Sequence, residues 1–476
     1  MLRIIRRSYM KLKKLTTALM LTGLAGLPLA SFADSTEDLV NALVTKGVLT
    51  EEEGALLAKN RTKEKKSEPK VSVDKKGITV KSADDNFKMQ IGGRLHATFA
   101  DHSHGNLGST ADPTDGTEIR RARLYAKGKF YKKFGYMAEV DFAGDKVSIK
   151  DFFATYNPNK NWELTVGNQK HAFSMEVQES SNDIMFAERS LVYALSVPYF
   201  DRAIGVNLKA MGKNWNVQGG IYGDGVGNTT DASAANNSSS ATQENSEGKG
   251  FGIRGTWNPV LEKDRMIHLG ANYGYRKQSD GGEINNGKTP SFAIATNNFS
   301  GLKFVNSGHI RGFNDVQMGI LEFSAMNGPF SFQSEYAKGW VDRDDGYSDY
   351  DVDAYYAQVG WTLTGESRTY KATDGEFKRL KPAKNFDPDK GTWGAWELAL
   401  RYDAVDLNDA DIQASNSSPV GGEAKRVGLN LNWYLNENIR VLAGLERTYD
   451  IDLLNKDNGS NVDDIDQFIV RAQWAI

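Results

Sequence analysis

The sequence contains no cysteine among its 476 residues. Disulfide frameworks, cysteine-ligated zinc, iron–sulfur clusters and thiol nucleophiles are therefore excluded. Long apolar runs are also missing, because no segment after the first ~30 residues has the roughly 18 apolar residues that a membrane-spanning helix requires. With a mean hydropathy of −0.51, a helical-bundle membrane protein is excluded, whereas a transmembrane β-barrel, whose strands alternate polar and apolar residues, is not.

The N-terminus has the pattern of an export signal. Six basic residues precede an apolar run over residues 15–29, and Ser31-Phe32-Ala33 offers small residues at positions 31 and 33, which predicts a signal peptide over residues 1–33. Met10 is an alternative start, since it leaves a signal of more usual length. A membrane anchor is disfavoured because the apolar run is too short to span a bilayer. Without residues 1–33 the chain has nine more acidic than basic residues, so no nucleic-acid partner is expected.

Residues 34–70 differ in pattern from the rest. Apolar residues at helical spacing end at Gly47, and Thr50 with Glu53 fits a capping box that opens a second short helix. The charged stretch that follows contains Pro69 and has the composition of a linker. We therefore predict a periplasmic helical hairpin and a charged linker over 34–70.

From Phe87 onward the apolar residues recur with a period of two, which indicates strands with one apolar and one polar face. Such two-faced segments lie near 87–100, 121–130, 135–143, 148–156, 162–168, 203–211, 214–222, 250–257, 266–277, 313–325, 329–339, 353–364, 394–403, 424–434, 438–449 and 466–476. We predict an all-β fold over residues 71–476, a sixteen-stranded antiparallel transmembrane β-barrel.

The connections between these segments are unequal in length. Very short ones, such as 212–213, 327–328 and 436–437, mostly alternate with long polar loops such as 101–118 and 405–423. Outer-membrane barrels have this asymmetry, with short turns in the periplasm and long loops outside, and sixteen strands leave room for an aqueous channel. A soluble array of β-sandwiches would explain the alternation but not the asymmetry.

Five short runs carry a resemblance to a known family. They are Ile91-Gly92-Gly93-Arg94-Leu95, Arg120-Arg121-Ala122-Arg123-Leu124-Tyr125, Glu139-Val140-Asp141-Phe142, Ser180-Ser181 with Glu188-Arg189-Ser190, and Leu363-Thr364-Gly365-Glu366-Ser367-Arg368-Thr369-Tyr370-Lys371. In this order, over about 85–476, the chain resembles the phosphate-selective porin O and P family. The resemblance implies a homotrimeric outer-membrane channel for anions, in which inward-folded loops narrow the pore and basic residues guide the anion.

The resemblance also implies an anion-binding site. By motif, its residues are Arg94, Arg120, Arg121, Asp151, Ser180 and Arg189. The arginines would bind or guide the anion, Asp151 would be the acidic residue at the constriction, and Ser180 would contact the ligand. The segment 169–202 would be the inward-folded constriction loop, and the long periplasmic connection 365–392 would also fold inward. Because Arg120 and Arg121 alternate, we expect Arg120 at the mouth of its strand unless a bulge turns it inward.

Two positions depart from the family pattern. Val177 follows Glu176, where the family's phosphate-binding prototypes have a lysine. The loop 278–312 is poor in the arginines that the corresponding family loop has. The family resemblance therefore supports the predicted fold more strongly than it supports specificity for phosphate.

The polar face of the predicted strands is rich in charge. Together with Arg94 and Arg121, the residues expected to line the pore are Arg123, Lys127, Lys129, Glu139, Asp141, Lys209, Arg254, Arg276, Arg426 and Arg471. Clustered cations in a narrow lumen raise the local anion concentration, and guanidinium groups chelate oxyanions. The alternative is that these charges are merely tolerated in a wet pore, because the lipid face would cost roughly 2–4 kcal/mol each.

Three further patterns are weaker. Glu139 and Asp141 share a face, which fits a transverse field or salt bridges better than acid–base catalysis. His102 and His104 have no evident third ligand, and the acidic stretch 342–353 fails the EF-hand spacing. No metal or cofactor is therefore expected, and the low-complexity stretch 228–247 is predicted to be an external loop.

These patterns combine into one prediction. We expect a homotrimeric outer-membrane porin for passive diffusion of small anions, with phosphate or polyphosphate as the substrates that the resemblance implies, and with membrane lipid and lipopolysaccharide as its surroundings. The alternative is a structural or adhesive barrel whose pore is plugged or non-selective. An enzyme is the least favoured class.

Overall fold

The computed structural model describes residues 35–57, 68–104, 113–226, 248–277, 290–295, 303–308, 310–344, 346–409, 421–452 and 464–476. The predicted signal peptide, the low-complexity stretch 228–247 and most of the loop 278–312 lie outside the described residues. The chain divides into two compact units, residues 1–69 and 70–476.

The first unit contains two short helices. Helix α2 (Ser35–Thr45) ends in a turn with Gly47 at a φ of 70°, and a second helix covers residues 51–57. Its start has a reciprocal capping box, in which the Thr50 N–H donates to Glu53 Oε2 and the Glu53 N–H donates to Thr50 Oγ1. A Cβ on Gly54 would lie 2.5 Å from Val44 Cγ2, so glycine permits the close approach of the two helices. None of the helices in the described part of the chain is long and apolar enough to cross a bilayer.

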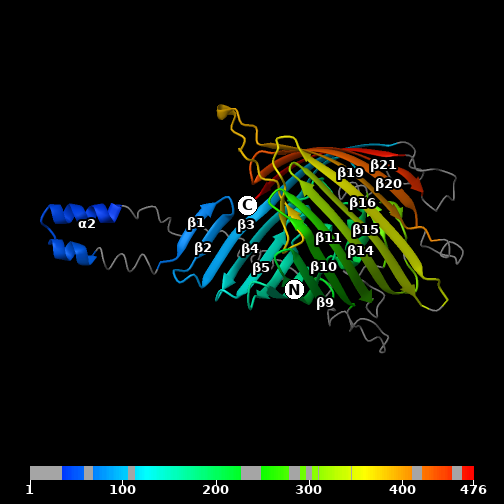
Figure 1. Cartoon of the computed structure of the whole chain (residues 1–476), viewed down its shortest axis with the longest axis horizontal. Coiled ribbons are helices and arrows are strands. Elements are labelled where there is room, and N and C mark those ends of the chain that lie inside the picture. The colour runs from blue at the N-terminus through cyan, green and yellow to red at the C-terminus, as the bar shows by residue number, and fades with distance from the viewer. Residues whose placement is uncertain are drawn as a thin grey trace, which may run out of the picture. The chain divides into compact units, whose positions relative to one another are not determined.

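The second unit is an antiparallel barrel (Figure 1). Its strands are β3 (Phe87–His104), β4 (Gly116–Phe130), β5 (Phe134–Asp141), β6 (Ser148–Tyr156), β7 (Trp162–Lys170), β8 (Arg202–Met211), β9 (Trp215–Tyr222), β10 (Lys249–Leu261), β11 (Arg265–Lys277), β14 (Phe313–Asn327), β15 (Phe330–Arg343), β16 (Tyr350–Thr362), β19 (Ala395–Asp406), β20 (Glu423–Tyr434), β21 (Ile439–Asp452) and β22 (Ile465–Ala475). Each strand pairs with the next, and β22 pairs with β3 from Ala475↔Arg94 to Ile465↔His104, which closes the barrel. The predicted sixteen-stranded barrel is confirmed.

A hairpin extends the sheet at one end of β3. Strands β1 (Lys70–Asp74) and β2 (Gly77–Lys81) pair with each other, and β2 pairs with β3 from Ile78↔Ile91 to Lys81↔Lys88. This hairpin is not among the sixteen predicted segments. The remaining short elements lie in connections: η1 (Ala143–Asp145), α4 (Met175–Gln178), α5 (Leu191–Phe200), β12 (Ala293–Ala295), β13 (Lys303–Asn306), β17 (Thr369–Lys371), β18 (Glu376–Lys378) and η2 (Pro388–Lys390).

The alternation of the sequence separates two faces of the barrel wall. Outward side chains are apolar and exposed, as for Leu124 at 59% and Leu321 at 64%, while inward polar side chains such as Asn216 and Gln333 are buried. Near the short-turn ends the outward positions include exposed tryptophans, among them Trp162 and Trp215, as in an interfacial aromatic girdle.

Part of the lumen is filled by an apolar core. Helix α5 carries Leu195 and Tyr199 into a cluster with inward side chains of β14–β16, including Met318 and Tyr356. A Cβ on the inward-facing Gly274 would lie 2.5 Å from Phe200 Cε1, so glycine lets the end of α5 reach the wall. The lumen is therefore narrowed by a packed insertion, not by an open loop.

Candidate functional site

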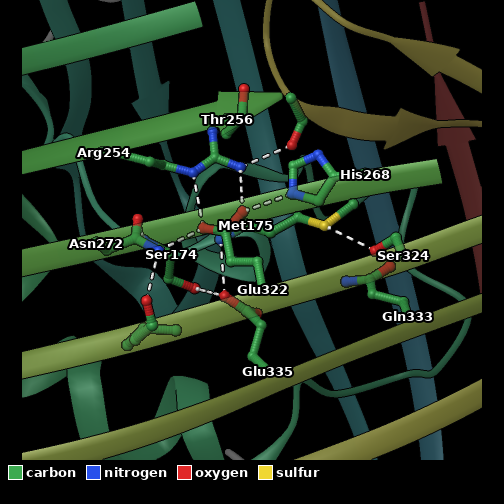
Figure 2. A network of polar contacts seen from close by, with 12 residues as sticks. Ser174, Met175, Arg254, Thr256, His268, Asn272, Glu322, Ser324, Gln333 and Glu335 are labelled. Carbon is green, nitrogen blue, oxygen red and sulfur yellow. Dashed lines mark hydrogen bonds and ion pairs between the residues drawn. The ribbon is translucent and has the colours of Figure 1, made fainter. Parts of the chain in front are cut away.

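Two connections fold into the lumen from opposite ends of the barrel. The first is the segment 171–201 between β7 and β8, which contains α4 and α5 and matches the predicted constriction loop. It is held by Glu335 of β15, whose Oε1 accepts hydrogen bonds from Ser174 Oγ at 2.9 Å and the Met175 N–H at 2.8 Å (Figure 2). The Ser174 N–H donates to Asn272 Oδ1 on β11. The loop is thus fixed to the barrel wall at the start of α4.

The second is the segment 363–394 between β16 and β19, which carries the β17–β18 hairpin. Arg254 of β10 donates to the carbonyl oxygens of Asp374 and Gly375 at 2.9 and 2.7 Å. The same guanidinium forms a bidentate ion pair with Glu322 of β14, at 2.8 Å for both contacts. His268 joins Glu322 to Tyr370 of β17. This second connection therefore folds inward, as the resemblance implied.

The anchors of the two segments are connected. Asn272 accepts from the Ser174 N–H and donates from Nδ2 to Glu322 Oε1 at 2.6 Å. Glu322 in turn pairs with Arg254, which holds the turn at Gly375. Figure 2 shows these groups side by side on the inner face of β10–β15. One polar network of the wall thus positions both insertions.

Between the insertions and the wall β3–β9 lies a cavity of about 460 Å³. Nine cationic side chains and six carboxylates line it. All six residues of the predicted anion site are among its lining, namely Arg94, Arg120, Arg121, Asp151, Ser180 and Arg189. Of the residues predicted to line the pore, Arg123, Glu139 and Lys209 also belong to it.

Some of the lining cations are neutralised by carboxylates. Glu139 accepts from Arg94 at 2.7 Å and from Arg123 at 2.8 Å. Asp151 is held in a bidentate pair by Arg202, at 2.8 and 3.3 Å. The remaining pairs are Arg123–Asp141, Arg120–Glu188, Arg202–Asp201 and Lys209–Asp374. These pairs fix the geometry of the wall and contribute little net charge.

Four lining cations have no carboxylate within 4.0 Å in the part of the chain that the structure describes: Arg121, Lys150, Lys170 and Arg189. Arg189 donates to the carbonyl oxygens of Glu176 and Glu179, and Lys170 donates to those of Gln178 and Glu179. Arg121 lies 3.5 Å from His96 Nδ1 with its Nη1, while its Nε has no hydrogen-bond partner among the described residues. Their uncompensated charge gives the cavity a positive potential.

A bulge decides the direction of Arg120. The register between β3 and β4 shifts between His96↔Arg121 and Ala97↔Ile119, so Arg120 is an extra residue on β4. Its side chain points inward and pairs with Glu188 of the constriction loop at 3.0 Å. Two successive arginines therefore face one cavity, which strict alternation would not permit.

Seven of the residues predicted to line the pore do not line this cavity. Lys127 and Lys129 are exposed further along β4, and Asp141 is covered by Arg123. The other four are buried, Arg276 beside the β9–β10 connection and the rest beside the insertions, and are held by ion pairs: Arg254 with Glu322, Arg276 with Asp224, Arg426 with Asp403, and Arg471 with Glu188. The structure turns these four side chains inward and buries them against connecting segments, so they do not line this cavity.

The sequence reading missed three lining cations: Lys150, Lys170 and Arg202. Lys150 had a usable signal, since it alternates with the apolar, outward Ile149. Lys170 and Arg202 face each other across β7 and β8 at the two ends of the constriction loop. Their position depends on where the strands stop, which the alternation does not determine.

Two loop carboxylates have shifted pKa values. Burial raises the pKa of Glu179 to about 8, against the effect of Arg368 at 3.8 Å. Burial also acts to raise the pKa of Glu188, but Arg120 and Arg471 outweigh it and hold that pKa well below its usual range. Glu188 is therefore a permanent counter-charge beside the cavity, whereas Glu179 is neutral at neutral pH.

Comparison with known proteins agrees with this geometry. The family model described as phosphate-selective porin O and P matches residues 89–475. Porin O of Pseudomonas aeruginosa is 28% identical over 440 residues, covering 84% of this chain and 91% of its own. An uncharacterised protein of Caulobacter vibrioides is 28% identical over 303 residues, covering 62% of this chain and 57% of its own.

Solved structures share the fold at low sequence identity. An anion-selective porin from Comamonas acidovorans has a TM-score of 0.50 at 12% identity, covering 82% of this chain and all of its own. OprB of Pseudomonas putida has a TM-score of 0.51 at 9% identity, covering 82% and 94%. The chain therefore belongs to the phosphate-selective porin O and P family and is an outer-membrane β-barrel porin of a Gram-negative bacterium.

Proposed function

We propose that this porin forms a water-filled channel for the passive diffusion of small anions, with phosphate or polyphosphate as its preferred substrates. The observation that carries the proposal is the group of four cations in the cavity without a carboxylate partner: Arg121, Lys150, Lys170 and Arg189. Family and fold are those of a channel rather than an enzyme.

The proposed mechanism is electrostatic attraction followed by weak binding. An anion that enters the lumen meets a low-dielectric wall with uncompensated positive charge, which lowers its entry barrier. At the constriction Arg121 and Arg189 replace part of its hydration shell, and Ser180, 3.3 Å from Arg94 Nη1, offers a hydroxyl to the same site. The carboxylates of the wall keep binding weak enough for release.

The proposal also covers the oligomeric state and the strength of phosphate binding. We infer a homotrimer, as the family resemblance implies, and place the helical unit of residues 35–57 in the periplasm. Val177 lines the cavity where the family prototypes have a lysine, which supports weaker phosphate binding than in those prototypes.

The test is the chloride current of the purified trimer in a planar bilayer, recorded while phosphate is added. We expect phosphate to reduce the chloride current at millimolar concentrations. Chloride current without such a block would reduce the proposal to a general anion pore. A barrel with a structural or adhesive role, plugged by its two insertions, would give no current in either case.

A further inference from the structure

The six carboxylates that line the cavity differ in how their oxygens are used. Both oxygens of Glu139 and both of Asp151 accept hydrogen bonds from arginine. Asp374 likewise meets Lys209 with Oδ1 and Lys371 with Oδ2. Glu376 is different: Oε1 contacts Lys378 Nζ, while Oε2 is buried and has no hydrogen-bond partner in the described part of the chain.

The position of Glu376 is fixed by the fold. It begins β18 on the inward turn, directly after Gly375, whose carbonyl oxygen accepts from Arg254 Nη2 at 2.7 Å. The residue is only 5% exposed, yet it lines the cavity. The β17–β18 hairpin, which Arg254 holds at Gly375, therefore positions the Glu376 carboxylate at the cavity.

Glu376 lines the same cavity as Lys170, one of the cations of the proposed function. Burial raises the pKa of Glu376, and Lys378 and Lys170 act against that rise. Lys170 is one of the four cations without a carboxylate partner, and its Nζ is turned to the carbonyl oxygens of Gln178 and Glu179. An anion that reaches Lys170 therefore comes close to the unpartnered oxygen of Glu376.

This arrangement distinguishes anions by whether they carry a hydrogen-bond donor. A buried acceptor without a donor is unfavourable, and a donor supplied by the ligand relieves this. An anion such as sulfate, which has no proton at neutral pH, places its own lone pairs against Glu376 Oε2. A protonated oxyanion such as hydrogen phosphate, or an anion with an ammonium group, offers a donor to Glu376 and negative charge to Lys170.

We propose that Glu376 makes the constriction selective for small anions that carry their own hydrogen-bond donor, either an O–H or an ammonium group, over anions that carry none. The inference rests on the proposed function as an anion channel and adds the residue that determines which anions bind. Glu376 acts by direct contact with the permeating anion.

The experiment compares the half-blocking concentrations of two pairs of probes on the chloride current in planar bilayers at neutral pH. Inorganic phosphate against inorganic sulfate tests the O–H donor, and aspartate, which is a net anion with an ammonium group, against succinate tests the ammonium donor. In the wild type we expect the donor-bearing member of at least one pair to block at about tenfold lower concentration. The pair that shows the difference identifies the source of the donor.

The decisive variant is Glu376→Gln. Its amide oxygen stays on Lys378, so its NH2 group takes the place of Oε2 and presents donors in place of an acceptor. We expect the tenfold preference to vanish or reverse. Glu376→Asp keeps the acceptor and is expected to retain part of the preference, which shows that the turn is still folded inward.

Glu163→Gln is the matched control. Glu163 also lines the cavity, but it accepts a hydrogen bond from Asn157 Nδ2 at 3.1 Å. Its replacement removes the same charge from the same cavity, so both variants change the chloride current, but only Glu376→Gln changes the ratio within a pair. The difference in electrophoretic migration between heated and unheated samples of each variant verifies that the barrel is folded.

Three results would overturn the inference: equal block by both members of each pair in the wild type, an unchanged ratio in Glu376→Gln, or the same loss of ratio in Glu163→Gln. In each of these the wild type still carries an anion-selective current, so the proposed function stands. If the wild type carries no anion-selective current, the proposed function and the inference fail together.

Discussion

The hydroxyl of Ser174 donates a hydrogen bond to the carboxylate of Glu335 over 2.9 Å, and this contact fastens the constriction loop to the barrel wall. The same carboxylate accepts from the N–H groups of Met175 and Glu176, at 2.8 and 3.1 Å. Ser174 Oγ in turn caps the short helix α4 by accepting from the Val177 N–H. A wall carboxylate therefore satisfies the donors at the start of α4, so the loop depends on the wall for its position.

Replacing Glu335 by Ala should release the constriction loop. The variant leaves two buried backbone N–H groups and the hydroxyls of Ser174 and Tyr356 without this acceptor, which costs about 1–3 kcal/mol for each group. We expect single-channel conductance to rise and anion selectivity to fall, because the loop carries Arg189 away from Arg121. Glu335→Gln keeps one acceptor oxygen and should show a smaller change. Unchanged conductance in Glu335→Ala would mean that the loop is held by its apolar core alone.

Removing both Arg121 and Arg189 should weaken anion preference without unfolding the barrel. Neither arginine has a carboxylate partner in the described part of the chain, so Arg121→Ala with Arg189→Ala leaves no buried carboxylate unpaired. We expect the anion-to-cation permeability ratio to fall about tenfold, read from the reversal potential in a salt gradient. Lys263→Ala, in an exposed periplasmic turn, is the control and should leave the ratio unchanged. The same reversal potential in the double variant and the wild type would remove these arginines from the site.

Glu188→Gln should strengthen anion preference. In the wild type its carboxylate neutralises Arg120 at 3.0 Å and Arg471 at 2.6 Å. Its pKa stays well below the usual range, so it carries its charge at neutral pH and stabilises the docked loop above the ordinary carboxyl pKa. That stabilisation is lost as the pH falls through the lowered pKa. We therefore expect a higher anion-to-cation ratio in Glu188→Gln and a loss of loop docking in strong acid in the wild type only. A lower ratio in this variant would show that Glu188 positions Arg120 more than it neutralises it.

Anion selectivity should fall as the pH rises through about 8. The pKa of Glu179 is raised from 4.5 to about 8 by burial, so the folded protein keeps a proton that the unfolded chain loses from 4.5 upward. Its contribution to the free energy of unfolding is therefore complete below 4.5 and is lost as the pH rises to about 8. Above that value the Glu179 carboxylate, which lies 3.8 Å from Arg368, adds a negative charge to the constriction loop. The backbone carbonyl oxygen of the same residue accepts from Lys170 and Arg189, so the new charge lies on the segment that positions these two cations.

Chloride is the charge carrier for that measurement, because phosphate itself titrates near neutral pH. Glu179→Gln is expected to remove the pH step while keeping the wild-type ratio below it. A step of equal size in Glu179→Gln would assign the pH dependence to another group, such as the α-amino group or a lysine.

The barrel was predictable because a single physical pattern determines it. A strand between lipid and water must alternate, so Leu124 and Arg123 could be assigned to opposite faces from the sequence alone. The β1–β2 hairpin escaped this reasoning, since both of its strands are short and β1 is exposed along its whole length. Its apolar residues, Val71 and Val73 on β1 and Ile78 and Val80 on β2, do alternate with polar ones, but five residues give too short a run to distinguish a strand from the adjacent linker.

The sequence predicted many of the residues that line the cavity, but not which of the cations among them lack a carboxylate partner. Alternation places Arg471 and Arg121 inward equally, yet Arg471 is covered by Glu188 and Ala187, nearly 300 positions away in the chain. Which arginines keep an uncompensated charge depends on such contacts between the loops and the wall. The bulge at Arg120 and the strand end at Lys170 likewise arise from pairing between strands.

The apolar core that fills part of the lumen was also not predicted from the sequence. Val316, Met318 and Ile320 point inward on β14, where a porin wall is expected to be polar, because α5 covers them. The outward side of the same strand carries Leu321 and Phe323, so β14 is apolar on both faces in this stretch. When both faces of a strand are apolar, its sequence does not alternate, so periodicity cannot assign its residues to the two faces.

The central claim is that the uncompensated cations of the constriction make this barrel an anion channel. The most direct test is the reversal potential of the purified wild-type protein in a planar bilayer with a potassium chloride gradient. The account predicts a reversal potential with the sign of chloride selectivity, carried by Arg121, Lys150, Lys170 and Arg189. A potential with the sign of potassium selectivity, or no current at all, would contradict it.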